Sequence, residues 1–261
     1  MREIELLVVV VRAFDDPYSP DAPRPTGEAA DMLAELLLAD LSVIERKLER
    51  MRKEHDKGQE RELIQRLQQA LEAETWLSEL ELNAQELESL SGYNFLTLKP
   101  VLVVANTDED KAGKEASEEV EASMASLKHP VIALSAKVEA EIAQLPPDEQ
   151  RAFLDDLGVP FSARDRFIRQ AYAMLDLISF FTVGEDEVRA WTLRRGSNAQ
   201  QAAGKIHTDL AKHFIRAERM TVDDILHYGS EVKVREAGKL ELKGKTYIPE
   251  DGDILHIRAN A

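Results

Sequence analysis

The stretch Val101-Leu102-Val103-Val104-Ala105, followed by Asn106-Thr107-Asp108-Glu109, decides how this sequence folds. Its first five residues form an unbroken apolar run rich in β-branched side chains, which is typical of a strand buried on both faces of a parallel sheet. Ligands of open α/β sheets bind outside the carboxyl ends of the strands, where the polar residues follow here. The stretch therefore predicts an α/β sheet with a binding loop at its edge.

Two further runs have the same character, Leu6–Arg12 and Val131–Leu134. We expect both to be parallel strands buried on both faces. The polar residues Ser135-Ala136-Lys137 follow the last run, so a second loop should lie beside the first. A helix is expected between the second and third strands, at residues 115–126.

Residues 27–91, between the first and second strands, carry two helical patterns. The first is a seam with alternating spacings of four and three, typical of packed helices. Its members are Leu37, Leu41, Ile44, Leu48 and Met51. The second contains Ile64, Leu67, Leu71, Leu77 and Leu80, after the polar turn at residues 55–58. The two patterns predict an antiparallel helical hairpin inserted into the sheet domain.

The remaining chain predicts two helices and then a small mixed domain. The helices are expected at residues 147–157 and 162–177, with Asp148 and Ser162 as N-caps. After about Asp176 we expect strands at 179–183, 187–193, 240–242, 246–248 and 253–258, with helices at 199–207 and 222–228. This order suits an α+β domain of the β-grasp, ubiquitin-like type.

Composition limits the classes of function. The 261 residues contain no cysteine, which excludes disulfides and thiolate chemistry. No apolar run reaches the roughly 18 residues of a membrane span, and acids near the start argue against a signal peptide. We therefore expect a cytoplasmic protein without a membrane partner. The six histidines are dispersed, so we expect no metal site.

Positive charge is concentrated in one segment, although the net charge is −16. Residues 189–219, here called the basic segment, contain seven basic and two acidic side chains. The overall charge disfavours non-specific binding of polyanions, and no DNA partner is expected. The candidates for phosphate contact with RNA are Arg194, Arg195, Lys205, Lys212 and Arg216. The alternative is that these side chains cover the core of this domain or dock the domain on the sheet domain. We assign Trp191 and Phe214 to the core.

Several stretches resemble the Obg-like ATPase (YchF) family. They are Val9–Pro17, Leu36–Glu45, Phe95–Pro100, Glu187–Thr192, Gln201–Asp209, Phe214–Glu218 and Asp251–Asp253. The resemblance implies a partial P-loop NTPase domain (1–26 and 92–175), a helical hairpin insertion (27–91) and a TGS domain (176–261). It also implies a purine nucleotide as cofactor, with ATP preferred over GTP, and a ribosome or RNA partner.

The resemblance also assigns residues to the nucleotide base. Asn106, Thr107 and Glu109 occupy the place of the guanine-recognising N-K-x-D motif, in which the aspartate accepts two hydrogen bonds from guanine. A glutamate there is one methylene longer and favours adenine. Ser135, Ala136 and Lys137 resemble the second base-contacting loop; the alternative is an ordinary turn with Ser135 as an N-cap.

The sequence departs from the family at the phosphate-binding motif, because it contains no G-x-x-x-x-G-K-S/T. That motif supplies backbone amides, a lysine and the magnesium-binding hydroxyl. The Mg²⁺ ligands of the complete family protein are therefore absent, and we expect a truncated chain that does not hydrolyse nucleotide alone. The alternatives are a non-catalytic adaptor that binds ribosome or RNA through the TGS domain and hairpin, and a decayed gene product.

Overall fold

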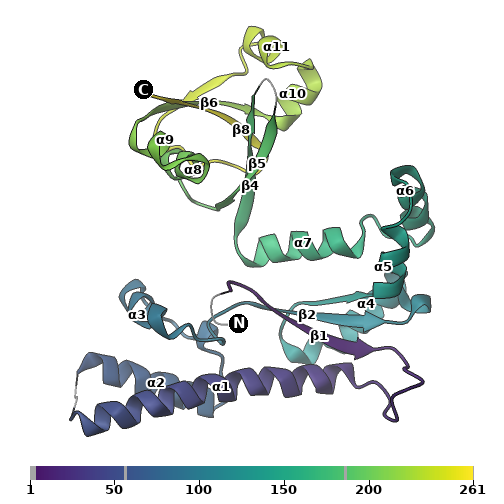
Figure 1. Cartoon of the computed structure of the whole chain (residues 1–261), viewed down its shortest axis with the longest axis vertical. Coiled ribbons are helices and arrows are strands. Elements are labelled where there is room, and N and C mark those ends of the chain that lie inside the picture. The colour runs from purple at the N-terminus through teal and green to yellow at the C-terminus, as the bar shows by residue number, and fades with distance from the viewer. Residues whose placement is uncertain (1–3, 56–57, 185–186, 261) are drawn as a thin grey trace. The chain divides into compact units, whose positions relative to one another are not determined.

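The computed structural model describes residues 4–55, 58–184 and 187–260. They form two compact units, one ending at Ala171 and the other beginning at Tyr172 (Figure 1). None of the helices described is long and apolar enough to cross a membrane.

The first unit is built on a three-stranded parallel sheet. Its elements, with the helix that leads out of it, are β1 (Leu7–Ala13), α1 (Pro25–Lys53), α2 (Gln59–Glu72), α3 (Ala84–Leu90), β2 (Val101–Thr107), α4 (Lys114–Ser123), β3 (Val131–Leu134), α5 (Ala136–Ile142), α6 (Pro147–Asp156) and α7 (Ala163–Met174). The strand order is β1-β2-β3, with Val9 beside Val103 and Ala105 beside Ala133. The start of α1 packs on one face of this sheet. All three predicted strands are therefore present and parallel.

The strands differ in burial, and the expectation of burial on both faces is wrong for β1. The side chains of Val101 to Ala105 in β2 are all buried, because β2 is the central strand. Val8 and Val10 of β1 are 40% and 67% exposed, whereas Val9 between them is buried. An edge strand with one open face gives this alternation.

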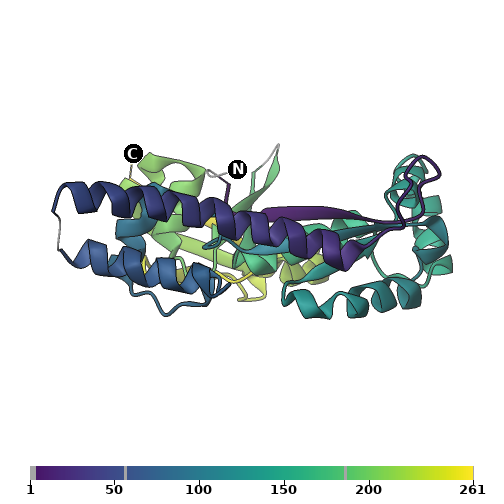
Figure 2. The same cartoon turned by 90° about the horizontal axis from the view of Figure 1, so that it is seen from below.

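Helices α1 and α2 run side by side in opposite directions as the predicted hairpin (Figure 2). Its core contains Ile44, Ile64 and Leu67, none of which is exposed. The second helix is shorter than predicted. It ends at Glu72, and Glu74 has a φ of 55°, a left-handed conformation in which a helix does not continue.

The apolar pattern predicted too long a second helix. Leu77 and Leu80 pack on the hairpin core, but they do not belong to α2. Leu77 lies in a short 3₁₀ turn, Leu77–Glu79, and Leu80 follows that turn. Two residues of the predicted polar turn, Asp56 and Lys57, lie outside the described residues.

A buried carboxylate joins the hairpin to the sheet. Asp40 of α1 has no exposed surface. Its Oδ2 accepts hydrogen bonds from the backbone N–H of Thr97 at 2.8 Å and from the Thr97 hydroxyl at 2.9 Å. Because Thr97 lies just before β2, this contact fixes where the chain returns from the hairpin.

The outer edge of β3 is closed by side chains. The backbone N–H of Ala133 donates to Glu121 of α4 at 2.9 Å, and its carbonyl accepts from Arg166 of α7 at 2.8 Å. Arg166 and Glu121 also form an ion pair of 3.6 Å. These are the backbone groups that a neighbouring strand would use.

One of the two predicted N-caps is confirmed. The Ser162 hydroxyl accepts from the backbone N–H of Asp165 at 3.1 Å, at the start of α7. The other prediction is wrong, because Pro146 occupies the N-cap position of α6 and Asp148 lies inside its first turn. Proline at the first helical position, here Pro147, is favourable because its missing N–H has no helical partner to lose.

The second unit is a β-grasp domain built on a mixed five-stranded sheet. Its elements are β4 (Leu177–Val183), β5 (Val188–Arg194), α8 (Ala199–Ile206), α9 (Thr208–Lys212), β6 (Phe214–Thr221), α10 (Val222–Tyr228), α11 (Glu231–Glu236), β7 (Glu241–Lys243) and β8 (Asp253–Ala259). The strand order is β5-β4-β8-β6-β7, in which only the β4–β8 pair is parallel among the described strands. Helix α8 packs its alanines on one face, over Phe180 and Leu193.

The sequence missed three elements of this unit, namely β6, α9 and α11. It also predicted a strand at residues 246–248, which the structure describes without assigning a strand there. Tyr247 lies instead in a loop, where its hydroxyl donates to Asp253 at 2.6 Å. Burial and this hydrogen bond raise the pKa of Tyr247.

Candidate base-binding pocket

The two predicted binding segments meet at the carboxyl edge of the parallel sheet, although Ala136 and Lys137 of the second one belong to the first turn of α5. Asn106 of β2 is in register with Leu134 of β3, so the residues after each strand are neighbours. Between them lies a hollow of about 160 Å³. It is lined by Phe14, Asn106, Thr107, Asp108, Glu109, Ser135 and Lys137. The structure thus brings together five of the six base-contacting candidates as lining residues, and the sixth, Ala136, lies between Ser135 and Lys137.

One hydrogen bond links the two loops. The side-chain Oδ1 of Asn106 accepts from the backbone N–H of Ala136 at 2.9 Å. This fixes the orientation of the carboxamide, because its oxygen must face the N–H and its NH₂ group must point elsewhere. The Ser135 hydroxyl, in turn, accepts from the backbone N–H of Val138 at 3.5 Å and caps α5.

Two residues of the pocket were not identified from the sequence. Phe14 follows β1 directly, and Asp108 accepts a hydrogen bond from the backbone N–H of Asp15 at 3.3 Å. The loop after β1 therefore forms a third side of the hollow. The available signal was an aromatic residue immediately after a parallel strand, where ligands of such sheets bind.

The hydroxyl of Thr107 is a polar group in need of a partner. Thr107 is only 4% exposed, and its Oγ1 makes no hydrogen bond within the described residues. A buried hydroxyl without a partner is costly.

An ion pair joins the two loops at the pocket. Lys137 Nζ contacts Glu109 Oε1, and the side chains are 67% and 54% exposed. The hydrogen bond to Glu109 and the charge of that carboxylate raise the pKa of Lys137. Glu109 thus has its cationic partner within the protein itself.

The size of the hollow limits what it can hold. Sites that enclose a whole small ligand usually measure roughly 300–1,000 Å³. The 160 Å³ found here suits one flat ring system and leaves the rest of a nucleotide outside.

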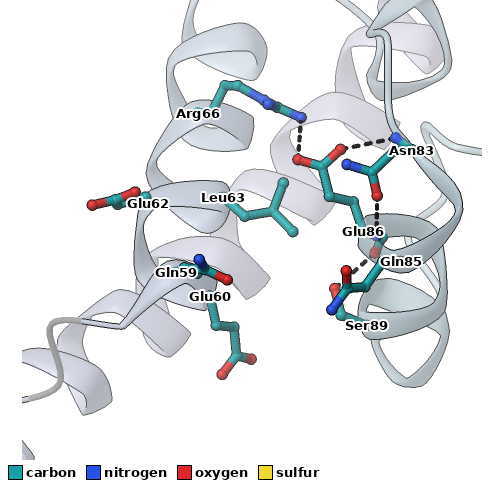
Figure 3. Close-up of a pocket in the computed structure, with 9 residues that line it drawn as sticks. All are labelled: Gln59, Glu60, Glu62, Leu63, Arg66, Asn83, Gln85, Glu86 and Ser89. Carbon is teal, nitrogen blue, oxygen red and sulfur yellow. Dashed lines mark hydrogen bonds and ion pairs between the residues drawn. The ribbon is translucent and has the colours of Figure 1, made fainter.

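A larger hollow of about 620 Å³ lies in the hairpin region, between α2 and α3 (Figure 3). Arg66 of α2 reaches across it to Glu86 of α3 at 3.0 Å. Glu86 also forms a capping box with Asn83. The charges of Arg66 and Glu86 are therefore engaged in holding the two helices together. No three His, Asp or Glu side chains converge as a metal site in the described part of the chain.

Comparison with known proteins shows which family the chain resembles. Residues 177–260 match the family model YchF-GTPase_C, described as a protein of unknown function (DUF933). The chain is 35% identical over 272 residues to the ribosome-binding ATPase YchF of Bacillus subtilis, and 37% identical over 271 residues to that of Escherichia coli O157:H7. Each match covers 100% of this chain and 74% of the relative. The chain belongs to the YchF family.

Solved structures agree with this assignment. The YchF GTPase of Schizosaccharomyces pombe superposes with a TM-score of 0.84 at 31% identity, covering 98% of this YchF-family chain and 73% of the other. A GTP-binding protein of Pyrococcus horikoshii superposes with a TM-score of 0.59, covering 99% of this chain and 80% of the other. At 17% identity, the second match supports the fold alone.

The basic candidates of this YchF-family chain are divided between two faces of the second unit. Arg194 and Arg216 are neighbours of Leu193 and Ala217, which face the core under α8, so both arginines point to the opposite face of the sheet. Lys205 and Lys212 lie on α8 and α9 themselves. The sequence could not show this division, because it depends on the register of the strands.

Some of these charges have acidic partners. Arg195 pairs with Asp176 at 3.1 Å, and Lys212 with Asp209 at 3.6 Å. The core assignment of Phe214 is confirmed, since it is 4% exposed. Trp191 packs at the edge of the same core, and the guanidinium of Arg189 lies 4.3 Å from the centre of its ring.

Proposed function

We propose that this chain binds the base of a purine nucleotide in the hollow between the Asn106 and Ser135 loops, and prefers adenine to guanine. The observation that carries the proposal is the hydrogen bond from Ala136 N–H to Asn106 Oδ1. It holds the Asn106 NH₂ group as a donor for N7 of the purine. The second lone pair of Oδ1 then suits the N6 amino group of adenine.

The remaining lining residues suit a flat base with polar edges. Phe14 offers a ring face, and stacking on an aromatic side chain contributes roughly 1–3 kcal/mol per base. Thr107 supplies a buried hydroxyl that has no partner among the described residues. A base placed in the hollow would lie beside both residues.

Within this proposal, residues 1–26 and 92–175 are the nucleotide-binding part and residues 27–91 are an inserted hairpin. Residues 176–261 are the TGS domain. The relatives are named ribosome-binding ATPases, and we extend ribosome or RNA binding to this chain through the basic segment. The cytoplasm follows from that partner.

Hydrolysis is not part of the proposed activity of these 261 residues. The sequence contains no G-x-x-x-x-G-K-S/T motif, which would supply the phosphate-binding amides, the lysine and the Mg²⁺-binding hydroxyl. The described residues of the pocket fit a base rather than a metal-bound triphosphate. The second candidate function, a non-catalytic ribosome or RNA adaptor, is favoured by the exposed Lys205 and Arg216.

Titration with ADP, followed by amide NMR of the whole chain, tests the base site. The backbone N–H of Ala136 and the side-chain NH₂ of Asn106 should shift together and saturate. Inorganic pyrophosphate at the same concentration is the control and should leave both signals unchanged. Shifts confined to other residues, or equal shifts with pyrophosphate, would rule out the proposed site.

A further inference from the structure

We propose that Lys137 is a positioning residue for base selectivity. Through its ion pair with Glu109, it withholds that carboxylate from guanine and so favours adenine. The inference rests on the proposed function, because it requires a base in the hollow. The preference for adenine would then depend on Lys137 as well as on Glu109.

The geometry gives Lys137 this position. Glu109 follows β2, whereas Lys137 lies in the first turn of α5; both line the same hollow, and their charged groups are in contact. Within the described part of the chain, the Glu109 carboxylate makes no other hydrogen bond or ion pair. Lys137 is therefore the one cationic partner of this carboxylate among the described residues.

Guanine and adenine make opposite demands on these two loops. Guanine carries donors at N1 and N2, so it needs a carboxylate as acceptor, and its O6 needs a donor. Here the carboxylate is paired with Lys137, and the nearby Ala136 N–H already donates to Asn106. Adenine carries no proton on N1 and a donor at N6, so it needs neither group. The Lys137–Glu109 ion pair and the Ala136–Asn106 hydrogen bond therefore both disfavour guanine.

The expected effect is modest and depends on salt. Both side chains are more than half exposed, and exposed ion pairs are weak and screened by salt. Removing the charge of Lys137 should shift the ratio of ADP to GDP affinity toward GDP by about two- to fivefold. ADP and GDP carry the same phosphates, so their ratio reports the base alone.

The experiment measures ADP and GDP affinity by NMR titration for the whole wild-type chain and three variants. Lys137→Met should raise the affinity for GDP relative to that for ADP by about the factor given. Lys137→Arg keeps the charge and should keep the wild-type ratio. Lys137→Met combined with Glu109→Gln should lose the gain in GDP affinity, because the freed carboxylate is gone. In 1 M NaCl the wild-type ratio should approach that of Lys137→Met.

Two outcomes would overturn the inference in different ways. If the wild type binds ADP at Ala136 and Asn106 but Lys137→Met leaves the ratio unchanged, Lys137 has no role in selectivity and the base site stands. If the wild type binds neither nucleotide, the proposed function fails and the inference fails with it. A loss of folding in Lys137→Met would appear in the spectrum, and Lys137→Arg at low and high salt would then decide.

Discussion

The side-chain oxygen of Asn106 accepts a hydrogen bond of 2.9 Å from the backbone N–H of Ala136, and this contact makes one binding edge out of two loops. Asn106 lies near the end of the central strand β2, and Ala136 begins helix α5 after the edge strand β3. The contact therefore serves both the stability of the sheet edge and the proposed recognition of a base.

Replacing Asn106 with alanine should affect both properties. We expect ADP binding to fall below detection and stability to drop by about 1 kcal/mol, the usual value of one hydrogen bond. Asn83→Ala is the matched control, because Asn83 caps α3 in the same unit and lies outside the base pocket. It should lose similar stability and keep ADP binding. Equal loss of binding in both variants would show that stability alone is responsible.

Phe14→Ala should weaken ADP and GDP binding equally, by roughly tenfold, because stacking does not distinguish the bases. Phe14→Tyr retains a ring and should bind both nucleotides like the wild type. The ratio of the two affinities, measured by titration, separates this effect from that of Lys137. A change in the ratio would mean that Phe14 does more than stack.

Asp40→Ala should destabilise the first unit by about 2–3 kcal/mol, because it leaves the buried N–H of Thr97 without its acceptor. Thr97→Val removes only the hydroxyl donor and should cost about 1 kcal/mol. Chemical denaturation of both variants checks the order. A larger loss in Thr97→Val would contradict the role given to the backbone contact.

Glu218 should make the second unit sensitive to acid. The hydrogen bond from Arg258 lowers the pKa of Glu218 below its ordinary value of 4.5. At a pH above the ordinary pKa, the lowered pKa of folded Glu218 stabilises the fold. This contribution is lost as the pH falls through the pKa of the folded state. Glu218→Gln should therefore melt a few degrees below the wild type at pH 7. The difference should shrink below pH 4.5, and a difference independent of pH would refute the assignment.

The division of the basic segment allows its RNA role to be tested face by face. If RNA lies on the sheet face opposite α8, beside α10 and α11, Arg194→Ala with Arg216→Ala should flatten the salt dependence of binding by about 1.4 in log–log slope, at about 0.7 per phosphate. Lys205→Ala with Lys212→Ala, on α8 and α9, should then change that slope little. Equal effects of the two pairs, or a loss of thermal stability without loss of binding, would contradict a footprint on one face.

The sequence predicted best where burial alone decides the pattern. β2 is buried on both faces, so its apolar run marked the strand and the loop after it. β6 was missed because a strand inside the sheet carries Arg216, Glu218 and Arg219. Two of these charges are neutralised across strands, Glu218 by Arg258 at 3.0 Å and Arg219 by Asp253 at 2.6 Å. Such pairing depends on register, which a single sequence does not display.

The pocket was predicted in part for a similar reason. Its two loops follow strands that the sequence identified, and the polar residues at their ends were visible. Phe14 and the Lys137–Glu109 contact depend on how close the three loops come, which is set by the parallel register of β1, β2 and β3.

The parallel sheet has two unlike margins. At β3, Glu121 and Arg166 occupy the N–H and carbonyl of Ala133, whereas among the described residues no strand pairs with the outer side of β1. A further strand could therefore pair with β1, whereas at Ala133 the edge of β3 already has its hydrogen-bond partners.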